Sequence, residues 1–171
     1  MWSRRKRERE ISQRAERLHA IAVTASRERS LYVELGAPDT PEGRFELLTL
    51  HLNLLIERLR AEGREGEIQG QALFDRFLSH LDGAMREMGV SDISMARRMK
   101  RLGEAYYGRA KGLREALMEL PDTTALRAFC ARTLPTADSE RIADRIVARW
   151  VQLTEIPGVD VMAGDLVWKT T

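Results

Sequence analysis

The stretch Phe45-Glu-Leu-Leu-Thr-Leu-His-Leu-Asn-Leu-Leu-Ile-Glu-Arg-Leu59 decides the fold class of this chain of 171 residues. Nine of its fifteen residues are apolar. Leucines at positions 48, 52, 55 and 59 share one face of an α-helix, and leucines at 47, 50 and 54 widen that face. A helix that is apolar over so much of its surface has to be covered by other helices, so we expect it at the centre of the domain.

The same helical spacing continues on both sides of this stretch, and glycines and prolines mark the ends of helices. Gly36 and Pro38 stop the first helix, and Gly63 ends the central one. Asp39 or Thr40 can cap the central helix. The expected helices cover residues 2–36, 41–62, 71–88, 91–120, 122–134 and 138–156, with a polar connector at 64–70 and an irregular or briefly helical tail at 159–168.

No run of alternating apolar and polar residues is long enough to indicate a β-strand. We therefore expect an all-α fold, a single compact multi-helix domain with about six helices. The domain is expected to span residues 18–171, and residues 1–17 to form a basic N-terminal helical arm or tail.

The charge of the chain is concentrated in two places, although its net charge is only +2. Residues 1–17 carry a net charge of +4 and residues 91–114 carry +5, which leaves the remainder at −7. Two basic islands on an otherwise acidic protein indicate an anionic partner surface. Arginine makes up 24 of the 28 cations, which suits forked contacts to carboxylate or phosphate, although genome composition explains the same bias equally well.

Motifs for enzymatic chemistry and for metal binding are missing. The three histidines, at positions 19, 51 and 80, have no second ligand one helical turn away. The single cysteine, Cys130, is expected to be a small core residue. Neither a nucleophile elbow nor a phosphate-binding glycine loop occurs. We therefore expect no catalysis, no metal and no cofactor.

Membrane insertion and secretion are not indicated either. The most apolar stretch, residues 45–59, is too short and too polar to span a bilayer. No apolar segment of 7–15 residues follows the basic N-terminus, as a secretory signal would require. We expect a cytoplasmic protein with at most peripheral contact to the inner face of the cytoplasmic membrane.

The basic helix at 91–114 leaves three interpretations open. Seven cations with Tyr106 and Tyr107 between them could bind phosphates and stack bases, as in an RNA- or ribosome-binding module. The cations could instead form a contact surface for an acidic protein or for lipid headgroups. They could also be only the solvated face of a helix whose other face, with Met95 and Met99, is core.

Two longer stretches are specific enough to indicate a family. One is Gly36-Ala-Pro-Asp-Thr-Pro-Glu-Gly-Arg-Phe-Glu-Leu-Leu48, followed by Leu50-His-Leu52; the other contains Met88-Gly-Val-Ser-Asp-Ile93, Arg97-Arg-Met-Lys-Arg101 and Ala105-Tyr-Tyr-Gly-Arg109. Together they closely resemble the ubiquinol–cytochrome c chaperone family, the assembly factors for cytochrome b of the respiratory bc1 complex. The resemblance covers about residues 31–114, with a looser helical match beyond.

The resemblance implies a mostly helical, non-enzymatic chaperone that binds newly made cytochrome b. It also implies a bacterial-type member of the family, without the membrane anchor that some mitochondrial members have. The sequence departs from the family pattern at Ser91, Ser94 and Ala96, where family members often have glycine. Contact with the ribosome, known for mitochondrial members, stays open for this chain.

The matched residues divide into two groups by their expected roles. In the first group Asp39 is expected to cap the central helix, and Arg44 and Glu46 to pair with the basic helix. The motif and structural residues are Asp39, Thr40, Gly43, Arg44, Glu46, His51, Gly89, Tyr106 and Gly108. The second group combines cations with adaptable apolar side chains, which suits a groove that holds a client. These client-binding residues are Met88, Asp92, Met95, Arg97, Lys100, Arg101, Tyr107 and Arg109.

Overall fold

A computed structural model describes residues 2–168, except for the side chains of residues 2, 3 and 93. The helices are α1 (Trp2–Ser26), α2 (Arg29–Val33), α3 (Pro41–Arg60), α4 (Gly63–Glu87), α5 (Asp92–Met118), α6 (Thr124–Thr133), α7 (Ser139–Glu155) and α8 (Gly158–Ala163). No strand occurs in the described part of the chain. The all-α prediction is confirmed, and the expected six helices are the six of ten or more residues, to which α2 and α8 add short turns.

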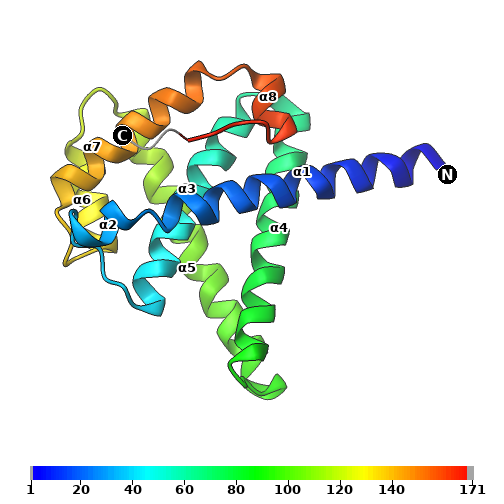
Figure 1. Cartoon of the computed structure of the whole chain (residues 1–171), viewed down its shortest axis with the longest axis horizontal. Coiled ribbons are helices and arrows are strands. Elements are labelled where there is room, and N and C mark those ends of the chain that lie inside the picture. Colours follow the sequence, from blue (N-terminus) through cyan, green and yellow to red (C-terminus); the bar gives the residue numbers. More distant parts are fainter. Residues whose placement is uncertain (1, 169–171) are drawn as a thin grey trace.

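The leucine-rich helix α3 is the centre of the fold, as its pattern predicted. It packs against α1, α4, α5, α7 and α8 (Figure 1). Thr40, and not Asp39, caps it: the hydroxyl of Thr40 accepts a 3.1 Å hydrogen bond from the backbone N–H of Gly43. Burial of so many leucines against five other helices supplies much of the apolar area that stabilises the domain.

The first predicted helix is interrupted, which corrects the expectation of one helix over residues 2–36. Residues 27 and 28 break it into α1 and α2. The break turns the chain so that Leu31 is buried and the carboxylate of Glu28 reaches Arg145 and Arg149 on α7. These partners lie far along the chain, so no local pattern indicates the break.

The expected connector at residues 64–70 is also wrong, because these residues form the start of α4. A Cβ atom on Gly66 would lie 1.8 Å from the backbone oxygen of Leu59, and one on Gly70 would lie 3.5 Å from Cγ2 of Ile56. Gly66 therefore permits the close approach of α4 to α3, whereas a Cβ at Gly70 would make only an ordinary van der Waals contact. The sequence alone favoured a loop, because glycine lowers helix propensity.

The C-terminal helices agree with prediction. α6 and α7 lie within a residue or two of the expected limits, and the carboxylate of Asp138 caps α7 by accepting from the backbone N–H of Arg141 at 3.1 Å. Cys130 of α6 is a buried core residue as expected, and burial raises the pKa of its thiol to about 12.

The N-terminal half of α1 extends beyond the rest of the bundle (blue in Figure 1). Residues 4–10 are exposed, and an ion pair of 2.7 Å joins Arg7 to Glu65 of α4. Helix α1 is continuous across residue 17, so the division of the chain at that residue stays a prediction. None of the helices in the described part is both long and apolar enough to cross a bilayer.

Candidate functional site

A groove of about 520 Å³ lies between α3, α4 and α5. Its aromatic residues are Phe74, Tyr106 and Tyr107, its cations are Arg60, Lys111 and Arg114, and its remaining polar residues include Asn53, Glu57 and Glu67. A space of this size takes a drug-sized molecule or a short segment of chain. Gly66 and Gly70 line it too, so the side of α4 that approaches α3 carries no side chain at these positions.

The aromatic side chains of the groove form one cluster. The ring of Phe74 lies 4.3 Å from that of Tyr106 and 5.5 Å from that of Tyr107, measured between centroids. Tyr106 is buried, and burial raises the pKa of its phenol, which therefore stays neutral. Tyr107 is 62% exposed and presents an apolar ring at the surface.

The charged residues of the groove are partly paired with one another. Arg114 donates to both carboxylate oxygens of Glu57, at 2.8–3.0 Å, and Nε of Arg60 lies 3.4 Å from the same carboxylate. This hydrogen-bonded pair raises the pKa of Arg114. The carboxylate of Glu57 therefore holds two guanidinium groups beside the groove, and their positive charges offset its negative charge.

Asn53 is a buried polar residue of the groove without a hydrogen-bond partner among the described residues. It is 1% exposed, and neither its carboxamide nitrogen nor its carboxamide oxygen makes a hydrogen bond within the described residues. An unpaired buried amide costs about 1–3 kcal/mol. The sequence pattern did not single out Asn53 as a site residue; the signal available was a polar residue inside so apolar a helix.

The first motif, residues 36–48, builds the entry to α3 and its link to α5. Glu46 accepts from Arg109 of α5 at 2.6 and 2.9 Å, which confirms its expected pairing with the basic helix. Arg44, which was expected to do the same, instead pairs with Asp39 at 2.7 Å. A Cβ on Gly43 would lie 2.1 Å from the backbone oxygen of Pro38, so only glycine allows this loop to fold onto the helix.

His51 is the buried histidine that the motif contributes to the core. Its Nδ1 lies 2.6 Å from the backbone oxygen of Leu47, and its ring contacts Trp168 edge-on with centroids 5.5 Å apart. Burial, together with the positive charge of Arg149, lowers the pKa of His51 to about 3.

This depressed pKa predicts that acid destabilises the protein well before pH 3. The unfolded chain takes up a proton near pH 6.5, whereas the folded protein does so only near pH 3, so stability is complete above pH 6.5 and falls with pH. Between pH 7 and pH 5 the loss from His51 is about 2 kcal/mol. Urea unfolding at both pH values checks this, and His51→Gln should reduce the difference. An equal pH dependence in the variant would contradict it.

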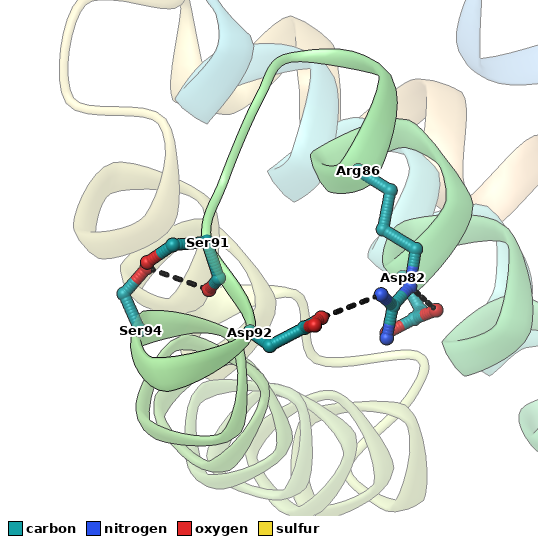
Figure 2. A network of polar contacts seen from close by, with 5 residues as sticks. All are labelled: Asp82, Arg86, Ser91, Asp92 and Ser94. Atoms are coloured by element: carbon teal, nitrogen blue, oxygen red, sulfur yellow. Dashed lines mark hydrogen bonds and ion pairs between the residues drawn. The ribbon is translucent and has the colours of Figure 1, made fainter.

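The first part of the second motif, residues 88–93, forms the turn between α4 and α5 and the start of α5, and the rest of the motif lies within α5 (Figure 2). Gly89, with φ of +77°, ends α4: its N–H donates to the oxygen of Arg86, and the N–H of Val90 donates to that of Met85. Arg86 then joins the two helices, because it donates to Asp82 at 2.8 Å and to Asp92 at 2.7 Å. Gly89 therefore has a structural role, as expected. Asp92, which was expected to bind the client, instead pairs with Arg86 of the same chain.

The predicted client-binding residues do not all lie together. Arg97, Lys100 and Arg101 are exposed on α5, and Met88 is 69% exposed at the α4–α5 turn. Tyr107 lies at the groove, and Arg109 is paired with Glu46. The expectation of a surface contact at Met95 is corrected, because Met95 is 5% exposed and belongs to the inward apolar face of α5.

Comparisons with known proteins identify the family. The sequence profile of the ubiquinol-cytochrome C chaperone matches residues 33–168, most of the chain. The chain belongs to this family. The structure is also similar to the crystal structure of the Cbp3 homologue from Brucella abortus, with a TM-score of 0.84 and 28% sequence identity over 97% of this chain and 94% of that one. The comparison with curated protein sequences gave no match.

Membership of the family extends the resemblance beyond the two motifs. The match reaches residue 168, and so includes α6, α7 and α8, where sequence reasoning had found only a looser likeness. Both motifs and the whole of the groove between α3, α4 and α5 lie within it.

Proposed function

We propose that this protein is a non-enzymatic assembly chaperone that binds newly made cytochrome b and promotes biogenesis of the ubiquinol–cytochrome c reductase (bc1) complex. The observation that carries the proposal is the family match over residues 33–168, supported by a structural likeness that covers 97% of the chain. It acts in the cytoplasm at the inner face of the membrane, where its client is inserted.

The exposed face of α5 supports a contact surface for such a client. Arg97, Arg98 and Arg101 are exposed and make no ion pair within the described residues, and Lys100 has only a distant partner, Glu104, at 3.9 Å. Met88 and Tyr107 add exposed apolar area on the same pair of helices. Unpaired cations next to apolar side chains suit a membrane protein that carries acidic loops and apolar segments.

Affinity purification tests this proposal. The tagged protein is recovered from mildly solubilised native membranes, and co-purifying proteins are identified by mass spectrometry. Cytochrome b without the other subunits of the mature complex is the expected result. Recovery of ribosomal components or RNA alone would contradict the proposal and support an RNA-binding role for α5 instead.

Charge reversal on α5 is expected to reduce client recovery. The variant Arg97→Glu, Lys100→Glu, Arg101→Glu replaces three unpaired or weakly paired cations and should lower cytochrome b recovery about tenfold or more, with an unchanged helical spectrum. Recovery is quantified against bait protein by mass spectrometry.

The matched control is Arg27→Glu, Arg29→Glu, Arg64→Glu, three exposed arginines outside α5, which should leave recovery unchanged. Equal losses in the two variants would show an effect of net charge alone. Equal retention would show that the α5 cations are only a solvated face.

A further inference from the structure

We infer that the groove between α3, α4 and α5 binds a short, extended, acidic–apolar peptide segment of the unfolded client. In this arrangement an apolar side chain enters the aromatic cluster, a backbone amide pairs with Asn53, and an acidic residue lies at the cations. The inference rests on the proposed function and adds to it the chemistry of the bound segment.

The carboxamide of Asn53 is the first reason for a peptide. It carries N–H donors and an oxygen acceptor on one planar group, and within the described residues neither its nitrogen nor its oxygen has a partner although the residue is 1% exposed. A backbone amide supplies the matching acceptor and donor. The pairing would remove the cost of an unsatisfied buried amide and would be strong, since Asn53 is shielded from water.

The aromatic cluster is the second reason. Phe74, Tyr106 and Tyr107 lie with ring centroids 4.3–5.6 Å apart at one wall of the groove, and only Tyr107 is exposed. An apolar side chain that enters here packs against the exposed ring of Tyr107 and is removed from water, while Phe74 and Tyr106 support that ring from the core. Because the rings of Phe74 and Tyr106 are buried in the core, they do not form an open platform on which the successive bases of RNA could stack.

The charges that line the groove are the third reason, because they favour an acidic peptide segment over a basic one. Three cations, Arg60, Lys111 and Arg114, line the groove together with two carboxylates, those of Glu57 and Glu67. Glu57 already lies against Arg60 and Arg114. The side chain of Lys111 is 77% exposed, and its nearest carboxylate, on Glu115, is 3.8 Å away. A peptide carboxylate can therefore pair with these cations, whereas a basic peptide would meet an excess of like charge.

A binding assay with defined probes tests the inference. Fluorescein-labelled heptapeptides carry a central Trp flanked by Asp, a central Ser flanked by Asp, or a central Trp flanked by Lys, and binding is followed by fluorescence anisotropy. The Trp–Asp probe should bind at least tenfold more tightly than either other probe. Equal binding of the Lys-flanked probe would overturn the charge assignment.

Asn53→Leu separates a ligand-binding amide from a structural one. Because the amide is unpaired in the free protein, its replacement should raise the urea midpoint while it lowers affinity for the Trp–Asp probe at least fivefold. A lower urea midpoint, or an unchanged affinity, would overturn the role of Asn53.

Filling the groove provides a second, independent variant. Ala110→Trp places a large side chain in the groove, and Ala96→Trp places the same side chain on the exposed face of the same helix. Only Ala110→Trp should lower affinity, at least tenfold. If it does not fold, Tyr107→Ala at the exposed lip replaces it. Loss of binding to a labelled oligo-uridine, rather than to the peptide, would overturn the inference in favour of RNA.

The membrane purification distinguishes the two proposals. If wild-type protein and Ala110→Trp recover cytochrome b equally, the groove inference fails and the proposed function stands. If the peptide results are as expected but no cytochrome b is recovered, the groove remains a peptide site and the proposed client is wrong.

Discussion

Glu28→Gln is expected to destabilise the protein by about 3–5 kcal/mol, which corresponds to a fall in Tm of about 6–20 °C. Glu28 is the counter-ion of a buried arginine: Arg149, 1% exposed at its side chain, lies 2.6 Å from the Glu28 carboxylate, and Arg145 lies 3.2 Å from the same oxygen. Burial lowers the pKa of Arg149, and Glu28 opposes that effect. Gln keeps the shape but leaves the guanidinium without its charge partner. Urea unfolding at pH 7 measures the loss.

Two further variants show whether the lost charge pair is the cause. Glu28→Gln combined with Arg149→Met should recover most of the stability, because the buried cation is then removed as well. Arg7→Gln breaks the exposed pair with Glu65 and should cost less than about 1 kcal/mol. A double variant as unstable as Glu28→Gln alone would contradict the explanation.

Gly66→Ala is expected to cost about 3 kcal/mol, or about 6–12 °C in Tm. The new methyl carbon would lie 1.8 Å from the backbone oxygen of Leu59 and 3.0 Å from Cβ of Glu62, so α4 has to move away from α3. Backbone cannot rotate aside as a side chain can. The loss exceeds the gain of roughly 1 kcal/mol in helix propensity that alanine brings. Thermal unfolding followed by circular dichroism measures it.

Gly83→Ala is the matched control on the same helix. A Cβ at Gly83 meets nothing within 4 Å, so this variant should gain stability from helix propensity alone. Opposite signs for the two substitutions are the expected result. If both stabilise the protein, the close approach of α3 and α4 at Gly66 is not the constraint described here.

Helices with a continuous apolar face could be predicted from the sequence because their burial depends on local spacing. This held for α3, α6 and α7, whose ends also carry their own signals, such as Thr40 and Asp138 at the caps. Prediction from local spacing failed where contacts with residues far along the chain determine the local structure. The break at Glu28 depends on arginines of α7, and the helical state of residues 63–70 depends on contact of Gly66 with α3.

The candidate site was predicted only in part for the same reason. Arg97, Lys100 and Arg101 are exposed because they lie on the side of α5 opposite its buried residues, such as Met95 and Tyr106, and the helical spacing predicts that side. Asp92 and Arg109 looked equally available, but each finds an opposite charge on another helix, Arg86 or Glu46. Because these partners lie on other helices, the residue pattern of α5 cannot indicate the ion pairs.

The sequence by itself determined the all-α class, the central position of the leucine-rich helix and the family, because each depends on neighbouring residues or on a contiguous motif. Only the tertiary structure decided which charges are paired, where the groove lies and that Asn53 lines it without a partner in the part of the chain that the structure describes. The groove is the space between three helices, and the amide is unpaired because none of the surrounding described side chains or backbone groups is placed to form a hydrogen bond with it. Both depend on distances between segments that are far apart in the chain.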